Sequence, residues 1–501
     1  MPQIAIIGSG FGGLGLGIEL KKRGLDTFTI FEKADSVGGT WRANTYPGAE
    51  CDIPSALYSY SFENFDWPNK WSHQPVIRDY LEHCATRYGL RPHLQFGATV
   101  TACVWDEDSQ TWEVTVDHGD DGAHTYRFDI VVSATGQLSR PRWPDIDGMD
   151  DFEGDLFHSA EWDHDVALSG RRVASIGAGA SAVQYVPPVA EQAAHTTVFM
   201  RTPNWIIPKN DRDYTGLEKA LIRRSRFARN LRRFGLWFRS DVVGFNLMRR
   251  ESKLRPLITA ASKKYLRDEV SDPDKRRALT PDYPMGAKRV LFSDDFYQAI
   301  EAHDVAIERD RIERIDATGI VTVDDDGTET HHDVDVIVIG TGFHTQDFLT
   351  PMKVIGRDGC NLHDDWSIDA GGPQALFGLT VHGYPNLFFM YGPNTNLGHT
   401  SIILMLESQA RYIWSVVAQM AERTLQSVEV TAAAQKRFND ELDERLADRA
   451  WVLIEDSWYL QAGRVTNNWV GRTTEYRRRT AQADLDDYTV TPKSTTLPTE
   501  L

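Results

Sequence analysis

The segment IAIIGSGFGG, residues 4–13, decides the fold of this chain. Four apolar residues end at a turn in which Gly8, Gly10 and Gly13 occupy the glycine positions of the pattern G-x-G-x-x-G. The first glycine permits a tight turn, the second lets backbone approach a pyrophosphate, and the third lets the next helix pack on the strand. The segment therefore predicts the start of a strand–helix–strand unit that binds a dinucleotide.

A carboxylate follows the second strand of this unit. The pattern predicts a helix at residues 14–22 and a strand at residues 27–31, after which comes Glu32. A carboxylate at this place accepts hydrogen bonds from ribose hydroxyls and repels a 2′-phosphate. The first unit thus favours an unphosphorylated adenosine ribose, as in FAD. The simpler alternative is a glycine-rich turn beside a solvated glutamate.

A second unit repeats the pattern with the opposite charge at its end. The segment GAGASA places Gly177, Gly179 and Ala182 at the three motif positions, and alanine is an accepted variant at the third. Strands are predicted at residues 172–176 and 197–201. Arg201 follows Gly177 by 24 positions, the same interval that separates Glu32 from Gly8. Because arginine pairs with a ribose 2′-phosphate, the second unit predicts NADPH, unless Arg201 is only a surface charge.

Length and composition set the class of protein. The chain has 501 residues, of which 41% are hydrophobic and 25% charged, which is typical of a soluble protein of two or three domains. The net charge of −18 argues against a nucleic-acid partner and against general attraction to anionic membranes. Four cysteines without a C-x-x-C pair indicate a reducing compartment. With no apolar run of about 20 residues and no signal-like N-terminus, we expect a cytoplasmic protein without membrane insertion.

The two units predict an α/β fold with two dinucleotide-binding Rossmann-like domains and a helical insertion in the second. We assign residues 1–140 and 336–485 to a discontinuous FAD-binding domain and residues 150–210 and 278–335 to an NADP-binding domain. Residues 211–277 are helical in pattern and basic, and form the insertion; residues 486–501 are expected to be a disordered C-terminal tail.

The segment between the two units carries a family fingerprint. It reads F-x-G-x-x-x-H-x-x-x-W-D, with Phe152, Gly154, His158, Trp162 and Asp163 at the fixed positions. The pattern resembles that of the class B flavin monooxygenases, and within them the type I Baeyer–Villiger monooxygenases, where proline is commoner at the last position. The resemblance implies that His158 couples conformational changes rather than shuttling protons. Without the resemblance, the segment reads as a linker with a packed histidine and tryptophan.

Other segments are similar to the same family. They are GGTWRANTYPGAECD at residues 38–52, FMRTPNWIIP at 199–208, YPMGAKRVLF at 283–292 and YGPNTNLGHTS at 391–401. Together the motifs and the resemblance indicate these cofactor-binding residues: Gly8, Gly10, Phe11, Gly12, Gly13, Glu32, Lys33, Gly39, Thr40, Trp41, Asp52, Tyr58, Val100, Gly177, Gly179, Ser181, Ala182, Arg201, Thr202, Lys288 and Arg289. The chain departs from the family at Gly340, where alanine is usual, and at Val470, where proline is common.

The resemblance also implies the chemistry. NADPH reduces FAD, O₂ adds to flavin carbon C4a, and the resulting peroxide inserts one oxygen beside a ketone carbonyl, giving an ester or lactone. Arg289 is the predicted catalytic residue that stabilises the negative charge, and Asp52 positions it. The insertion and Trp469 are expected to form a lid that excludes water. The alternatives are that Arg289 binds phosphate beside Lys288 and that Asp52 caps a turn.

The sequence leaves three other functions open. An N- or S-oxygenating flavin monooxygenase uses the same cofactors on softer nucleophiles, so sulfides are candidate substrates beside ketones. A disulfide or quinone reductase is the second; a disulfide reductase needs a redox-active cysteine pair, which the sequence lacks. A flavin-bound redox sensor without turnover is the third. We expect no metal, no nucleic acid, and a monomer or loose homodimer.

Overall fold

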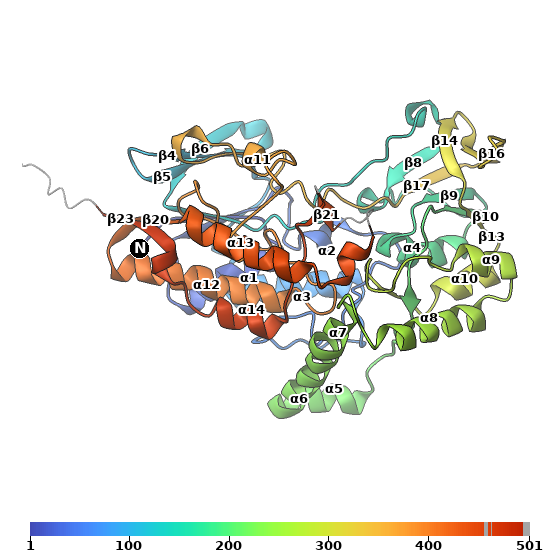
Figure 1. Ribbon diagram of the computed structural model, residues 1–501, viewed down its shortest axis with the longest axis horizontal. Coiled ribbons are helices and arrows are strands. Elements are labelled where there is room, and N and C mark those ends of the chain that lie inside the picture. Colours follow the sequence, from blue (N-terminus) through green and yellow to red (C-terminus); the bar gives the residue numbers. More distant parts are fainter. Residues whose placement is uncertain (455–458, 462, 494–501) are drawn as a thin grey trace, which may run out of the picture.

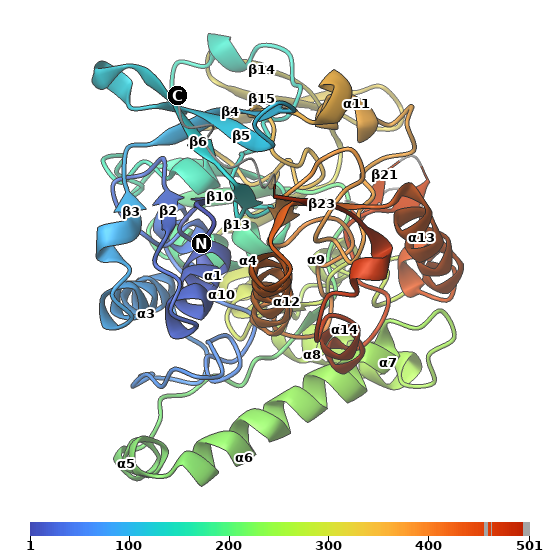
Figure 2. The ribbon, with the colours of Figure 1, turned by 90° about the vertical axis from the view of Figure 1, so that its left-hand side faces the viewer.

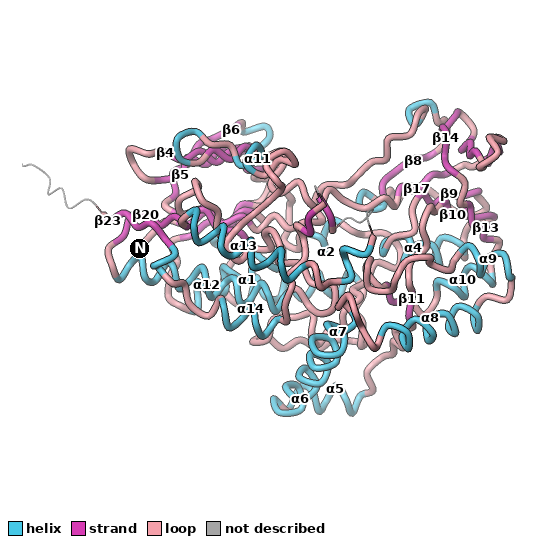
Figure 3. Tube along the Cα trace, in the orientation of Figure 1, coloured by secondary structure: helices cyan, strands magenta, loops and turns pink. Residues whose placement is uncertain are grey.

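The computed structural model describes residues 1–454, 459–461 and 463–493 and consists of two lobes. Each lobe is built on a five-stranded parallel sheet, and the lobes lie side by side along the longest axis of the molecule (Figure 1). Loops rather than helices or strands fill much of the junction between them (Figure 3). No helix in these residues is long and apolar enough to cross a membrane. The mixed α/β architecture with parallel sheets confirms the predicted fold class.

The first sheet has the strand order β19-β7-β1-β2-β3. Its strands are β1 (Ile4–Ile7), β2 (Phe28–Phe31), β3 (Leu94–Gln95), β7 (Ile130–Ser133) and β19 (Leu387–Phe389). Ile4 of β1 pairs with Phe28 and with Ile130, and both pairings are parallel. Helices α1 (Phe11–Lys22), α3 (Gln74–Arg87) and α12 (Ile403–Glu422) cover this lobe, and α1 packs against both others. The first strand–helix–strand unit is confirmed.

The second sheet has the order β13-β10-β9-β17-β8 and repeats the first. Its strands are β8 (Asp155–His158), β9 (Arg172–Ile176), β10 (His195–Phe199), β13 (Val305–Glu308) and β17 (Val336–Ile339). Helices α4 (Ala180–Ala190) and α10 (Phe296–Ala302) pack together on it. The central strand of this sheet, β9, is bordered by β10 and β17, just as β1 is bordered by β2 and β7 in the first sheet.

Smaller elements complete the lobes. A four-stranded sheet comprises β4 (Thr99–Asp106), β5 (Thr111–Asp117), β6 (Ala123–Phe128) and β18 (Lys353–Ile355), and a three-stranded sheet comprises β14 (Arg311–Asp316), β15 (Gly319–Val323) and β16 (Glu329–Asp333). Two-stranded pairs join β11 (Ile206–Ile207) to β12 (Leu291–Phe292), β20 (Leu425–Val430) to β23 (Tyr488–Pro492), and β21 (Leu460–Gln461) to β22 (Arg464–Val465). The remaining helices of these lobes are α2 (Thr40–Ala43), α11 (Leu362–Asp365), α13 (Ala432–Leu446) and α14 (Thr473–Arg479).

The region predicted as an insertion is helical. It contains α5 (Gly216–Arg224), α6 (Arg226–Trp237), a π-helix (Phe238–Gly244), α7 (Phe245–Leu247), α8 (Arg255–Glu269) and α9 (Pro273–Ala278). Helices α5 and α6 extend below the rest of the chain in two perpendicular views (Figures 1 and 2). We call residues 216–240 the arm.

Two predicted boundaries are wrong. Strand β17 was expected to begin the return to the first domain, but Val336 pairs with Val173 of β9 and Asp155 of β8, so this strand belongs to the second sheet. The tail expected from residue 486 is also wrong over residues 488–492, because these residues form β23, which pairs antiparallel with β20. Residues 494–501 lie outside the described part.

The chain passes between the lobes twice, and the two crossovers pair with each other. Pro141 forms an antiparallel bridge with Phe343. The backbone N–H of Arg142 donates to Gly342 O at 2.9 Å, and that of His344 donates to Arg140 O at 3.0 Å. The two passages therefore form one short two-stranded ribbon.

Candidate nucleotide-binding and catalytic site

The first glycine turn leaves no room for side chains. Gly8 has φ +103°, and a Cβ there would lie 2.6 Å from the carbonyl oxygen of Ala134. A Cβ on Gly13 would lie 1.9 Å from the carbonyl oxygen of Gly8. A Cβ on Gly39 would lie 3.0 Å from Gly10 Cα, so the turn and the loop before α2 face each other closely. These glycines are required by sterics, as the motif predicts.

Glu32 is built into the first turn. Its side chain is buried, and Oε2 accepts hydrogen bonds from the backbone N–H and the hydroxyl of Ser9 at 2.9 and 2.7 Å. The backbone N–H of Ala34 donates to Oε1 at 2.9 Å. The neighbouring residue Lys33 is exposed. The backbone N–H of Ala98 donates to the Glu32 carbonyl oxygen at 2.9 Å, and Ala98 directly precedes the strand that contains Val100.

The second glycine turn repeats this geometry, but the residue at the end of its unit is an arginine and not a glutamate. Gly177 has φ +115°, and a Cβ there would lie 2.5 Å from the carbonyl oxygen of Gly340. A Cβ on Gly340 would in turn lie 2.6 Å from the Tyr185 hydroxyl, which explains why glycine replaces the usual alanine. Arg201 is exposed, and no carboxylate in the described residues lies within ion-pair distance of it. Its guanidinium is therefore free to pair with a ligand.

Both turns fit a pyrophosphate. Gly10 caps the N-terminus of α1 and Gly179 caps that of α4, and neither helix has a side chain bonded to its first N–H groups. Unpaired N–H groups and the positive end of the helix dipole favour an anion at such a terminus. Gly179 has no atom within 4 Å of where its Cβ would be, so the space beside it is open. The two termini fit the two dinucleotides that the sequence predicts.

Aromatic side chains line the first turn. Phe11 meets Tyr58 edge-on with ring centroids 5.1 Å apart, and Trp41 Nε1 donates to the Tyr58 hydroxyl at 3.1 Å. Thr40 begins α2 beside them, and Gly12 packs against the Met390 side chain. The segments at residues 38–52 and 391–401 therefore approach the same turn.

The two segments expected near the nicotinamide nucleotide also lie together. Ile206 of β11 pairs with Leu291 of β12, and Trp205 Nε1 donates to the Tyr283 carbonyl at 2.9 Å. Thr202 and Lys288 lie on these two segments, and Lys288 Nζ is 5.2 Å from the centre of the Tyr283 ring. Ser181 and Ala182 occupy the first turn of α4.

Arg289 and Asp52 form a two-pronged ion pair. Arg289 Nε donates to Asp52 Oδ2 at 2.8 Å, and Nη2 donates to Oδ1 at 2.7 Å. The structure thus joins a residue from the first lobe's loop to one from the second lobe's β12 segment, 237 positions apart. Asp52 is the main reason that the pKa of Arg289 is raised above its ordinary value, so the guanidinium keeps its proton. The Arg289 side chain is 38% exposed, so part of it remains accessible.

Two tyrosines surround this pair. Tyr391 and Tyr459 both interact electrostatically with Arg289, and burial raises the pKa of Tyr459 to about 12. The Tyr391 hydroxyl donates to Asn396 Oδ1 at 2.6 Å. Tyr391 begins the predicted segment 391–401, whereas Tyr459 stands in no motif that sequence reasoning uses, so nothing in the sequence identified it.

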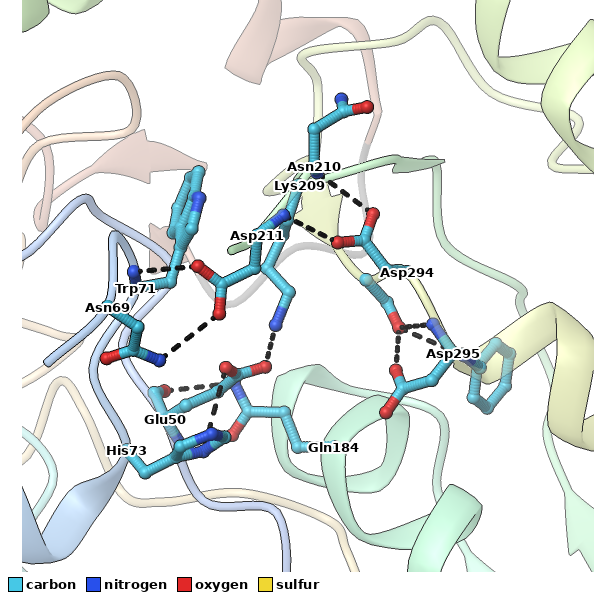
Figure 4. A network of polar contacts seen from close by, with 12 residues as sticks. Glu50, Asn69, Trp71, His73, Gln184, Lys209, Asn210, Asp211, Asp294 and Asp295 are labelled. Carbon is cyan, nitrogen blue, oxygen red and sulfur yellow. Dashed lines mark hydrogen bonds and ion pairs between the residues drawn. The ribbon is translucent and has the colours of Figure 1, made fainter. Parts of the chain in front are cut away.

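A polar network holds the loops of Asp52 and Arg289 in place (Figure 4). Glu50 forms a buried ion pair with Lys209, and Gln184 Nε2 donates to the Glu50 carbonyl at 3.0 Å. Asp211 accepts from the backbone N–H of Trp71 at 3.0 Å. The N–H groups of residues 210 and 211 donate to the Asp294 carboxylate at 3.0 and 2.9 Å. The segment 209–211 therefore links the loop that contains Asp52 to the segment that follows Arg289.

The fingerprint residues support the second sheet. His158 ends β8, is fully buried, and accepts from the backbone N–H of Ala160 at Nδ1. Burial lowers the pKa of His158, which keeps the ring neutral. The ring lies 5.7 Å from that of Trp143 and 6.1 Å from that of Phe343, one on each crossover.

The other fingerprint positions have packing roles. A Cβ on Gly154 would lie 2.5 Å from the Asp335 carbonyl oxygen, and 2.6 Å from the Phe152 ring. Trp162 packs on the Tyr185 ring at 5.6 Å. Asp163 Oδ1 accepts from the backbone N–H of Asp165 and caps a turn.

Trp469, which was expected to contribute to a lid, belongs to a cluster of buried hydrophobic residues. It is buried, stacks on Phe438 with ring centroids 6.4 Å apart, and donates from Nε1 to the Arg472 carbonyl at 3.2 Å. Val470 is fully buried beside it. A cavity of about 370 Å³ lies instead between residues 56–67 and the arm, and Arg289 is not among its lining residues.

Comparison with known proteins places the chain in a family. The model of the "Flavin-binding monooxygenase-like" family matches residues 1–354. A Baeyer-Villiger monooxygenase of Streptomyces coelicolor is 42% identical over 97% of this chain and 92% of its own length, and one of Pseudomonas aeruginosa is 41% identical over 98% and 91%. The solved structure of an oxidised steroid monooxygenase bound to NADP has a TM-score of 0.85 at 30% identity, covering 98% of this chain and 99% of that one. The chain belongs to the flavin-binding monooxygenase-like family and, within it, to the Baeyer–Villiger monooxygenases, the FAD- and NADPH-dependent enzymes that its motifs indicated.

Proposed function

We propose that this protein uses NADPH and O₂ to insert one oxygen atom beside the carbonyl of a ketone, giving an ester or lactone and water. The observation that carries the proposal is the ion pair of Asp52 and Arg289, which joins the two nucleotide units at a point where the arginine side chain is partly exposed. A sulfide is a second class of substrate for the same activated oxygen.

The two turns divide the cofactors. Gly8, Gly10, Gly13 and Glu32 hold FAD, and Gly177, Gly179 and Arg201 hold NADPH. When bound, FAD accepts a hydride from NADPH and supplies oxygen activated for attack on the ketone. The polar network around Lys209 keeps the loops of the two units in register, so that the reacting groups meet in one geometry.

Arg289 stabilises the negative charge that develops on oxygen during the reaction. A fixed guanidinium in a closed site lowers the energy of such charge by about 3–4 kcal/mol. Its raised pKa means that it does not give its proton to the reacting oxygen. Asp52 accepts hydrogen bonds from two of its N–H groups and thereby fixes the orientation of the guanidinium.

An experiment on Arg289→Ala tests the proposal. The purified yellow protein is mixed with NADPH, air and a panel of ketones and sulfides, and the products are identified by mass. We expect wild-type protein to form esters or lactones. The variant should still bleach its flavin with NADPH, because hydride transfer does not need the guanidinium, while oxygenation falls by about 100- to 1,000-fold.

Two controls sharpen the result. Arg289→Lys keeps a positive charge but loses the two-pronged geometry, so it should recover only a small part of the activity. Wild-type protein that yields only sulfoxides, or only hydrogen peroxide, would overturn the proposed function. Normal oxygenation by Arg289→Ala would leave the reaction intact and refute the role of the arginine.

A further inference from the structure

The arm carries an apolar stripe that the described part of the chain leaves exposed. Phe227, Leu231, Phe234 and Phe238 follow the spacing of one helical face, and their side chains are 77%, 58%, 57% and 49% exposed. Leu217 and Leu221 of α5 add two more exposed side chains, at 82% and 56%. An exposed apolar face of this length on a soluble chain marks an interaction site.

The arm is also basic within an acidic protein. Residues 216–240 contain eight lysines and arginines and one acidic residue, Glu218, whereas the whole chain has a net charge of −18. Glu218 pairs with Arg212, outside the arm. In the described residues, Arg223 is the one cation of the arm that has a carboxylate partner, Asp66. Arg226 and Arg239 are exposed and lie next in sequence to Phe227 and Phe238, the two ends of the stripe; Arg226 also lines the cavity between the arm and residues 56–67.

Two other basic side chains of the arm, Arg229 and Arg233, face the body of the protein. Arg233 donates to the carbonyl oxygens of Ala56 and Ser59 at 2.7 and 2.9 Å, and Arg229 donates to the carbonyl of Ile222 at 2.9 Å. Arg229 and Arg233 line the cavity between the arm and the loop at residues 56–67. These bonds fix the orientation of α6, so the stripe points away from the body.

We propose that the arm docks this enzyme on an anionic lipid surface. An amphipathic helix with large apolar side chains on one face and arginines at its borders lies in the membrane interface, where hydrocarbon covers the stripe and anionic headgroups pair with the cations. The arm is the lowest part of the molecule in both views, so it reaches a flat surface before the acidic lobes do (Figures 1 and 2).

A second copy of the chain is a poorer partner. Two arms packed on each other would bring their cations together. On the lobes, the exposed large apolar side chains within the described residues are scattered, as at Trp143 and Ile368, and form no stripe to match that of the arm. A lipid surface supplies both the apolar layer and the negative charge, and the acidic lobes are repelled from it, which orients the enzyme with the arm toward the membrane.

Vesicle binding by the flavin-loaded protein tests the inference. We expect co-sedimentation with phosphatidylcholine vesicles that contain phosphatidylglycerol, little with phosphatidylcholine alone, and weaker binding at high salt. The double variant Phe227→Ser/Phe234→Ser should lose binding at least tenfold. Arg226→Gln should lose about fivefold, the equivalent of about 1 kcal/mol per cation near the surface. Flavin content reports that each variant is folded.

Matched controls separate this result from its alternatives. Leu257→Ser and Ile368→Ser remove equally exposed apolar side chains, 71% and 60%, outside the arm and should leave vesicle binding unchanged. Equal losses from these controls, or absence of binding to the anionic vesicles, would overturn the proposal. So would sedimentation showing that the arm variants convert a dimer to a monomer in a protein that ignores vesicles. The proposed oxygenation stands or falls separately, by its products.

Discussion

The two nucleotide units share one plan and differ at its end. In both, the glycine that opens the turn lies under the carbonyl of the residue that follows a neighbouring strand, Ala134 in the first unit and Gly340 in the second. Glu32 is buried and receives three hydrogen bonds from its own unit, whereas Arg201 is exposed. Glu32 is therefore held by contacts within the fold, whereas Arg201 is accessible to a ligand.

This difference separates folding from recognition. A change at the first unit disturbs buried contacts that exist without any ligand, and so affects both stability and FAD retention. On the proposed assignment, a change at Arg201 would remove only contacts to the bound nucleotide. The following predictions test this contrast, from the largest expected effect to the smallest.

Exchanging the third motif residue between the units should have very unequal outcomes. Gly13→Ala places a methyl group 1.9 Å from the Gly8 carbonyl oxygen, so we expect little folded, flavin-loaded protein. Ala182→Gly removes a methyl group that the second unit already holds, and should cost about 1 kcal/mol as a helix substitution. Thermal unfolding and flavin absorbance measure both. A yellow, stable Gly13→Ala protein would show that the two turns are not as different as their sterics indicate.

Arg201→Ala should change the choice of nucleotide without changing stability. Loss of a charge-assisted pair with the 2′-phosphate should lower kcat/KM for NADPH by about 10- to 100-fold, while kcat/KM for NADH changes little. Steady-state oxidation of the two nucleotides gives the ratio directly, and the melting temperature serves as the control. Equal losses for both nucleotides would contradict the assignment of Arg201 to the phosphate.

The smallest effect concerns an ion pair at the base of the second sheet. Asp335 accepts from Arg172 Nη2 at 2.7 Å and from its backbone N–H at 2.8 Å, and these bonds lower the pKa of Asp335 to about 2. A depressed pKa stabilises the folded state above the ordinary carboxyl pKa, and this contribution is lost as pH falls from about 4 to 2. Since the pair is partly exposed, we expect no more than about 1 kcal/mol.

Asp335→Asn isolates that contribution. Its deficit in free energy of unfolding relative to wild type should be full at pH 6 and should shrink as the pH falls below about 4, where the wild-type carboxylate also loses its charge. Urea unfolding at several pH values measures the deficit. A deficit that does not depend on pH would assign the effect to the backbone hydrogen bond alone.

Local pattern predicted most of the fold, because glycine turns and apolar strands are set by neighbouring residues. It could not place Val336–Ile339, since a buried strand reads alike in either sheet and only its pairing with β9 and β8 assigns it. The strand Tyr488–Pro492 was missed for a related reason: its polar, exposed residues resemble a tail, and its partner β20 lies about 60 positions earlier in the sequence.

The candidate site was likewise only partly predictable from the sequence. Asp52 and Arg289 were predicted as a pair, and the structure brings them together. Trp469 was expected, together with the insertion, to form a lid; its stacking on Phe438 could not be foreseen, because it depends on α13, a helix that the sequence did not indicate. Tyr459 could not be found because its nearness to Arg289 is created by the fold.

The paired crossovers set the mechanics of the whole molecule. A single linker would let one lobe swivel freely, but two antiparallel segments bonded at Pro141 and Phe343 resist twisting about their length while they still bend across their width. The ribbon therefore favours a hinge motion of one lobe relative to the other about a single axis. A relative motion of the lobes that bends this ribbon would follow one path, and would return the nucleotide-binding turn of one lobe to the same position relative to the other.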